Sequence, residues 1–364
     1  MSFERKTLGV AVIGAGRMGT HRARMASKHP AVRFLAISDL DPARAKALGE
    51  EVGAHFTTGD NEEAISHPDV NAVIVSTPEP RHVEPILQTI ERGKRVVVET
   101  PLALSLGDAD TLIEASASSG IELHVNYSKR YSRHYFLGKE QVVEGRLGRL
   151  LGGTARVYNS RAQAFEILKR TDEVTPVVDV LVYSVDMICW LMEGIRPVEV
   201  FARGHGVVFE EAGYPGIDDT TWAILTFEDG AVFSLGICYA LPYKYPTLGQ
   251  GTRLEVIGKE GVLLFDEDKK ENLLYTEKGY PHVYVPDHHI NTAFLGTNSA
   301  GDWALDHMFG PVAHETRAWL DYLSTGNPCL HPTAREARQT LEITLAIDES
   351  ARTGRAIELP ARVI

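Results

Sequence analysis

The sequence predicts two domains: an N-terminal doubly wound α/β domain with a parallel sheet, and a C-terminal α+β domain with an open, largely antiparallel sheet. Two observations carry this prediction. Apolar, β-branched runs alternate with amphipathic helical stretches over the first third of the chain, and consecutive alternating strands follow. The 364 residues suffice for two hydrophobic cores. We place the domains at residues 1–125 and 126–364.

The expected strands of the first domain are near-continuous apolar runs, which are typical of parallel strands buried on both faces. Amphipathic stretches separate them, as in chains that cross over through helices. The expected strands are 8–15, 33–39, 72–77, 95–100 and 121–126, and the expected helices are 18–29, 42–53, 82–93 and 108–120.

The second domain has a different pattern, because alternating strands follow one another without intervening helices. The sequence Glu-Asp-Gly at 228–230 predicts a hairpin turn, since glycine accepts a positive φ. Helices near 134–145, 178–193, 312–325 and 334–352 are expected, and we assign the last three to one face of this sheet. The expected strands are 150–159, 198–208, 220–229, 231–240, 252–261 and 261–268.

Composition excludes several classes of protein. The net charge of −12 argues against a nucleic-acid-binding surface, which needs a basic excess. The three cysteines, Cys189, Cys238 and Cys329, form no CxxC pair, so neither a disulfide framework nor a zinc site is expected. No signal sequence or membrane span is apparent. We expect a cytoplasmic protein without membrane or nucleic-acid partners.

A glycine-rich turn follows the first expected strand. Gly14-Ala15-Gly16-Arg17-Met18-Gly19 has the spacing GxGxxG and opens a helix. The first glycine permits the tight turn, the second lets the backbone approach a pyrophosphate, and the third allows close packing of helix on strand. The helix N-terminus offers N–H groups to phosphates. This pattern predicts a dinucleotide-binding Rossmann domain.

An acid stands where the dinucleotide pattern requires one. Asp39 ends the second expected strand, twenty residues after Gly19, and is expected to bind the adenosine ribose hydroxyls. A carboxylate there repels a 2′-phosphate, so NAD is favoured over NADP. Arg17 and Arg44 are the side chains that would tolerate NADP.

Over nearly its whole length the chain resembles the glucose-fructose oxidoreductase/inositol dehydrogenase (Gfo/Idh/MocA) family. The matching segments are STPEPRH (76–82), GKRVVVETPLA (93–103), LEVIGKEGVLLFD (254–266) and LAIDESARTGRAIELP (345–360). The resemblance implies that Ser76, Thr77 and His82 line the cofactor's path to the nicotinamide. It also implies that Glu99 lies near the nicotinamide ribose, and that Asn126 and Arg130 lie where cofactor and substrate meet.

Two departures from the family pattern affect the chemistry. The lysine of the family's EKP motif is Thr100 here, and the histidine of its D-x-x-x-H-x-x-D helix is Tyr183. Asp179 and Asp186 are retained. Residues at i, i+4 and i+7 share one face of an α-helix, so Asp179, Tyr183 and Asp186 are expected to point into one cleft.

Tyr183 is our candidate acid/base, assisted by Asp179. A phenol with a pKa near 10 is ionised in roughly one molecule in a thousand at pH 7, so a cation must lower its pKa. The alternative is a tyrosine packed at the domain seam. The candidate cations are Lys129, Arg130, Arg161 and Lys169.

The substrate is expected to be carbohydrate-like. Aromatic and basic side chains suited to a sugar or sugar acid are Tyr127, Tyr131, Tyr135, Tyr243, Lys244 and Tyr245, with Arg161, Lys169 and Asp186 as further substrate candidates. The alternative is that the aromatic group belongs to a core or interface. His288 and His289 are adjacent and do not have metal-ligand spacing, so no metal is expected.

Three functions remain open from the sequence. The first is an NAD-dependent oxidoreductase acting on a CH–OH group of a sugar, glycoside, polyol or sugar acid. The second is a redox-neutral, NAD-dependent glycoside hydrolase, and the third is a non-catalytic NAD-sensing regulator. The alternating strands around 220–240 further predict a homodimer or homotetramer formed through the second sheet.

Overall fold

The computed structural model describes residues 6–169, 174–243, 245, 251–267, 273–281, 289–294, 302–304 and 307–360. The chain divides into two compact units. The first comprises Met1–Tyr131 and Trp303–Leu341, and the second comprises Ser132–Asp302 and Glu342–Ile364. The proposed domain boundary after residue 125 falls within the last strand of the first unit's sheet.

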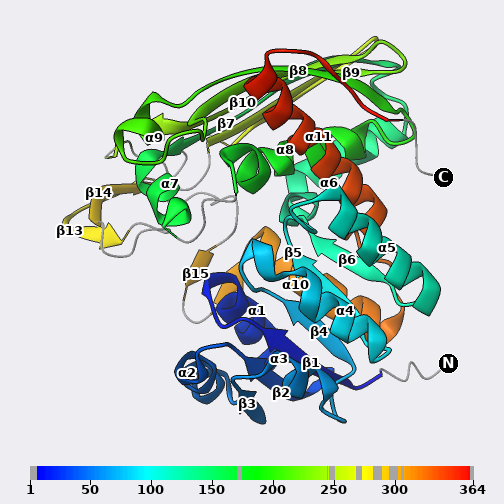
Figure 1. The fold of residues 1–364 in the computed structure, drawn as a ribbon, viewed down its shortest axis with the longest axis vertical. Helices are drawn as coiled ribbons and strands as arrows, with labels where there is room; N and C mark the ends of the chain where they lie inside the picture. Colours follow the sequence, from blue (N-terminus) through cyan, green and yellow to red (C-terminus); the bar gives the residue numbers. More distant parts are fainter. Residues whose placement is uncertain are drawn as a thin grey trace. The chain divides into compact units, whose positions relative to one another are not determined.

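The first unit contains a six-stranded parallel sheet in the order β3-β2-β1-β4-β5-β6 (Figure 1). The strands are β1 (Leu8–Ile13), β2 (Val32–Ser38), β3 (Phe56–Thr58), β4 (Ala72–Val75), β5 (Arg95–Glu99) and β6 (Leu123–Asn126). All of β1 is buried, as a strand covered on both faces requires. The order reverses between β1 and β4, the switch point at which doubly wound sheets bind ligands. The predicted parallel sheet is confirmed.

Helices connect these parallel strands. They are α1 (Arg17–Ser27), α2 (Pro42–Val52), α3 (Asn61–Ser66), α4 (Val83–Glu91) and α5 (Leu106–Ser119), with short 3₁₀ turns η1 (Glu79–Arg81) and η2 (Ser128–Tyr131). The Asp41 side chain caps α2, because it accepts a hydrogen bond from the N–H of Ala43. The sequence analysis missed β3 and α3, which are too short to show a period.

Helix α10 (Pro311–Thr325) belongs to the first unit. The expectation that residues 312–325 cover the second sheet was therefore wrong. Trp319 and Leu320 lie in one hydrophobic cluster with Leu8 of β1. An amphipathic helix buries its apolar face against any available apolar surface, so its periodicity does not say which sheet it covers.

The second unit contains a seven-stranded sheet in the order β12-β11-β7-β10-β9-β8-β17. The strands are β7 (Leu150–Ser160), β8 (Pro197–His205), β9 (Thr220–Phe227), β10 (Val232–Leu241), β11 (Gly251–Gly258), β12 (Val262–Asp266) and β17 (Ile357–Glu358). Only the β7–β10 pair is parallel. The turn at residues 228–230 joins β9 to β10, with Gly230 at a φ of 89°. The largely antiparallel sheet and its hairpin are confirmed.

One face of this second sheet is covered. Ile343 and Ile347 share a hydrophobic core with Val185 and with Leu225 of β9.

The other elements are α6 (Arg133–Val143), α7 (Arg161–Leu168), the π-helical turn η3 (Val177–Leu181), α8 (Val182–Leu191), α9 (Val207–Glu211), α11 (Ala334–Thr353), β13 (Leu273–Pro281), β14 (His289–Phe294), β15 (Asp302–Ala304) and β16 (His307–Phe309). None of the helices described is long and apolar enough to cross a membrane.

The opposite face of the second sheet exposes large apolar side chains. Trp222 and Ile224 of β9 are 47% and 41% exposed, and Leu264 of β12 is 68% exposed. Further exposed apolar residues on the same sheet are Leu151, Phe201, Val232, Ile257 and Val262. Exposed apolar side chains gathered on one sheet face are a candidate interaction site.

Candidate functional site

The glycine loop lies between β1 and α1. Gly14 has a φ of 98°, and a Cβ there would lie 2.6 Å from the carbonyl oxygen of Ser76. A Cβ on Gly19 would lie 1.8 Å from the carbonyl oxygen of Gly14, so only glycine lets α1 begin this close to the loop. A Cβ on Gly16 would meet no heavy atom within 4 Å. Gly16 and Arg17 are exposed and Met18 is half-buried, so the loop presents backbone outward for a phosphate.

Asp39 lies directly beside this loop. Its Oδ2 accepts a hydrogen bond from the N–H of Ala15 at 2.8 Å, and its Oδ1 accepts one from the N–H of Asp41 at 2.9 Å. A carboxylate has about four acceptor positions, so two backbone donors leave capacity for ribose hydroxyls. The acid and the glycine loop are therefore brought together as the dinucleotide pattern requires.

Ser76 and Thr77 follow β4 at the carboxyl edge of the sheet. The Thr77 hydroxyl donates to the carbonyl of Arg81 at 3.0 Å. The His82 ring is fully buried, with Nε2 3.1 Å from the Thr77 carbonyl and Nδ1 2.8 Å from the Pro101 carbonyl. Burial lowers the pKa of His82, and a neutral ring donates to one carbonyl only. The ring thus joins the loops at Thr77 and Pro101, and its expected role along the cofactor's path stays a prediction.

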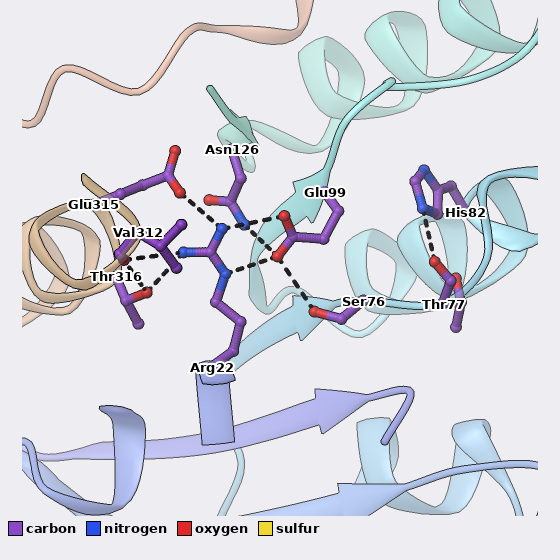
Figure 2. Close-up of polar contacts among 9 residues, drawn as sticks. All are labelled: Arg22, Ser76, Thr77, His82, Glu99, Asn126, Val312, Glu315 and Thr316. Atoms are coloured by element: carbon purple, nitrogen blue, oxygen red, sulfur yellow. Dashed lines mark hydrogen bonds and ion pairs between the residues drawn. The ribbon is translucent and has the colours of Figure 1, made fainter. Parts of the chain in front are cut away.

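Glu99 ends β5 in a buried polar cluster (Figure 2). Its Oε1 accepts hydrogen bonds from Arg22 Nε at 2.7 Å, from Asn126 Nδ2 at 3.0 Å and from Ser76 Oγ at 3.4 Å. The ends of β4, β5 and β6 are thus joined through one carboxylate. Thr100, the next residue, is half-buried.

The sequence analysis missed Arg22, which is buried on α1. Burial alone lowers the pKa of Arg22, but the carboxylates of Glu99 and Glu315 outweigh that effect and raise it. Its signal was an arginine on the helix stripe otherwise made of Gly19, Ala23 and Ala26, all of them buried.

Three further candidates precede or form η2, and all are buried: Tyr127, Lys129 and Arg130. The Arg130 guanidinium lies 3.0 Å from a carboxylate oxygen of Glu336. Although burial raises the pKa of Glu336, the Arg130 cation more than offsets this and lowers it. The positive charge of Arg130 is therefore balanced locally.

Asp179, Tyr183 and Asp186 lie in the second unit. Asp179 is in the π-helical turn η3, whereas Tyr183 and Asp186 are in α8. The expected spacing on a single α-helix was therefore wrong, since the wider π turn changes the angle between residue 179 and those after it. Asp179 and Tyr183 are half-buried, while Asp186 is 1% exposed. Asp186 thus belongs to the packed side of α8, not to an open cleft.

Tyr239, which hydrogen-bonds Asp179, and Asn159 on the neighbouring strand were also missed. The Tyr239 hydroxyl donates to Asp179 Oδ2 at 2.5 Å, within the range of bonds to an ionised carboxylate. Tyr239 and Asn159 follow the paired residues Cys238 and Tyr158 on β10 and β7, and both are buried. Both strands contact η3.

Asn159 marks a polar position inside an otherwise apolar register. It continues the inward series of Ala155 and Val157 along β7. Within the described part of the chain, neither its amide nitrogen nor its amide oxygen has a hydrogen-bond partner. Leaving a buried polar group unsatisfied costs about 1–3 kcal/mol. Such an amide is therefore expected to meet a ligand or water that both donates and accepts.

The two candidate cations of the second unit are differently placed. Arg161 donates to the carbonyls of Ala240 and Leu241 at 2.8 and 3.3 Å. Lys169 is exposed, and its hydrogen bond to Glu166 raises its pKa. Solvent and salt screen an exposed cation, which argues against Lys169 as the cation that activates Tyr183.

The expected aromatic candidates are divided between the two units. Tyr127 and Tyr131 belong to the first unit, and Tyr131 hydrogen-bonds His331 at 2.7 Å. Tyr135 is buried against Phe265. Tyr243 and Tyr245 are each 45% exposed, and Lys244 and His288 lie outside the described residues.

A parallel sheet whose switch point carries this loop and this acid is the architecture of NAD-dependent oxidoreductases. The sequence model described as "Oxidoreductase family, NAD-binding Rossmann fold" matches residues 8–127, and the model of the GFO/IDH/MocA C-terminal domain matches residues 138–264. The chain belongs to the Gfo/Idh/MocA family of NAD-binding oxidoreductases, which act on CH–OH groups.

Relatives cover most of the chain. A myo-inositol 2-dehydrogenase of Thermotoga maritima is 28% identical over 271 residues, covering 74% of this chain and 78% of that protein. A 2,7-anhydro-N-acetylneuraminate hydratase of Mediterraneibacter gnavus is 26% identical, covering 73% and 75%. The crystal structure of GenD2 from gentamicin A biosynthesis, in complex with NAD, has a TM-score of 0.80 and 25% identity, and covers 99% of this chain and 98% of that one.

Proposed function

We propose that this protein is an NAD-dependent dehydrogenase of a polyol or sugar. The observation that carries the proposal is the hydrogen bond from Tyr239 to Asp179, in the same unit as the buried amide of Asn159. Together these groups offer acceptors and donors to neighbouring hydroxyls. The relative named as a myo-inositol 2-dehydrogenase supports a polyhydroxylated substrate.

In the proposed site each side chain has one task. Asp179 accepts a hydrogen bond from a substrate hydroxyl, and its bond with Tyr239 fixes the orientation of the carboxylate. The Asn159 amide forms hydrogen bonds with a second substrate hydroxyl. Bound NAD supplies hydride acceptance, so the chain itself must orient the carbinol carbon and remove the hydroxyl proton. The glycine loop and Asp39 fit this cofactor, because the loop presents free backbone at Gly16.

We assign removal of the substrate hydroxyl proton to Tyr183, which stands in place of the histidine usual in the family. The phenol requires a lowered pKa, and the cation that provides it, expected among Lys129, Arg130 and Arg161, stays a prediction. Thr100 takes the position of the family's lysine and is proposed to face the substrate.

Tyr183→Phe tests this assignment. With NAD and a panel of inositols, aldoses and sugar acids, we expect kcat to fall by about 10²–10⁴-fold, the usual contribution of a general base. The dissociation constant for NAD should not change. Tyr158→Phe, which removes a half-buried phenol hydroxyl of the same unit outside the candidate site, is the matched control. Unchanged turnover in Tyr183→Phe would remove this residue from the mechanism.

A redox-neutral reaction is the second candidate, favoured by the relative named as a hydratase. Adding or removing water leaves the oxidation state of the substrate unchanged overall. The two candidates differ in one readout. The dehydrogenase accumulates NADH when given substrate and NAD, whereas the redox-neutral enzyme converts substrate without net NADH.

We also propose that the protein forms a homo-oligomer through the open face of the second sheet. On that face the Trp222 ring lies against Gly236, where a Cβ would come within 2.3 Å of it, and Tyr158 meets Trp222 edge-on. Trp222→Glu places a charge in this apolar patch. We expect light scattering to give a dimer or tetramer for the wild type and a monomer for the variant; a monomeric wild type at micromolar concentration would contradict the proposal.

A further inference from the structure

Arg22 uses every donor that its guanidinium has. Nε donates to Glu99 Oε1 at 2.7 Å, and Nη2 donates to Glu99 Oε2 at 3.1 Å and to Glu315 Oε2 at 2.7 Å. Nη1 donates to Thr316 Oγ1 at 2.7 Å and to the carbonyl of Val312 at 3.3 Å. These are five N–H groups and five acceptors, all inside the first unit.

These bonds join elements that are distant in the sequence. Figure 2 shows Arg22 reaching from α1 to Glu99 at the end of β5 on one side and to α10 on the other. The helix that begins at the glycine loop is thereby connected to the carboxyl end of β5 and to α10. The two parallel hydrogen bonds from Nε and Nη2 of Arg22 to the two carboxylate oxygens of Glu99 fix both the position and the plane of that carboxylate.

Glu99 transmits this geometry to two predicted cofactor residues. Its Oε1, held by Arg22, is the acceptor for Asn126 Nδ2 and Ser76 Oγ. Asn126 ends β6, whereas Ser76 follows β4. Their common reference point is therefore the carboxylate that Arg22 orients.

We propose that Arg22 is a positioning residue for the nicotinamide side of the dinucleotide site, acting through Glu99 on Ser76 and Asn126. The adenosine side, built from the glycine loop and Asp39, does not depend on it. The inference rests on the proposed function only in assigning Ser76, Glu99 and Asn126 to the nicotinamide half.

Arg22→Lys keeps the charge but replaces a planar fork of five donors by an ammonium with three. We expect the dissociation constant for NAD to rise by about tenfold or more, as losing one charged hydrogen bond does. Binding of AMP, which occupies the adenosine half alone, should stay within about twofold of the wild type. Arg24→Lys, at a half-buried arginine of the same helix paired with Glu51, is the matched control and should change neither value.

Equal losses for NAD and AMP, or unchanged NAD binding in a folded Arg22→Lys protein, would overturn the proposal. If that variant does not fold, Thr316→Val removes one acceptor of Arg22 at nearly constant volume. It should weaken NAD binding about two- to fivefold without affecting AMP, and unchanged NAD binding there also overturns the proposal. Wild-type protein that binds NAD but oxidises no polyol would defeat the proposed function and leave this inference standing.

Discussion

Replacing Gly19 by alanine is expected to abolish measurable NAD binding. The new Cβ would lie 1.8 Å from the carbonyl oxygen of Gly14, so α1 must move away from the loop that receives the pyrophosphate. Overpacking of this kind costs about 1–3 kcal/mol of stability. We expect the dissociation constant for NAD to rise by at least about 100-fold in calorimetry, together with a lower Tm.

Two other glycines make this result interpretable. Gly16→Ala introduces a Cβ with no neighbour within 4 Å, so Tm should hold while NAD binding weakens through the lost approach to the backbone. Gly107, in the first turn of α5, has only the Ser105 hydroxyl 3.9 Å away, and Gly107→Ala should change neither property. Full NAD affinity in Gly19→Ala would show that the loop does not bind the diphosphate.

Acid is expected to destabilise the protein well before its carboxylates titrate. Burial is the main reason that the pKa of His21 is lowered to about 4. Burial also lowers the pKa of His124 and of His331. Each of these groups is neutral in the folded state and charged when unfolded below about pH 6.5. Their stabilising contribution is complete above that value and is lost as pH falls toward the folded pKa.

The loss is large enough to measure. For His21 alone, the difference between 6.5 and about 4 corresponds to about 3 kcal/mol at pH 4. Urea unfolding between pH 7.5 and 4.5 should show a steady fall in the free energy of unfolding. His331→Gln should make that fall shallower. A free energy that stays constant over this range is incompatible with three histidines buried in the neutral form.

Asp348 works in the opposite direction. Burial is the main cause that raises its pKa to about 7, in spite of a hydrogen bond from Thr175 at 2.7 Å. The folded state therefore holds this proton more tightly, and the contribution of Asp348 is lost as pH rises toward 7. Asp348→Asn keeps an acceptor for Thr175, so it should stabilise the protein at pH 8 and steepen the acid dependence.

The sequence was most informative where chemistry is local. The parallel sheet followed from apolar runs, and the meeting of Asp39 with the glycine loop followed from strand order and spacing. Both depend on neighbours along the chain. Helix α10 shows the limit, because its apolar stripe fits either sheet and only the completed fold decides between them.

The buried polar residues could not be identified in the same way. Arg22 is recognised as a candidate functional residue only through its hydrogen bond to Glu315, which lies almost three hundred residues later in the sequence. Asn159 stands out only once its partners are counted, and the π turn that carries Asp179 breaks the period on which the helix prediction relied. The motif that contains His82 predicted the loop, but not that the ring is fully buried against the carbonyls of Thr77 and Pro101.

The proposed function requires that the loop at Gly14–Gly19 binds a dinucleotide whose adenosine ribose contacts Asp39. Isothermal titration of protein stripped of nucleotide tests this most directly. We expect one NAD per chain, with NADP binding weaker by at least about tenfold because its 2′-phosphate faces the carboxylate. Binding of neither nucleotide would contradict the assignment, and a preference for NADP would contradict the role of Asp39.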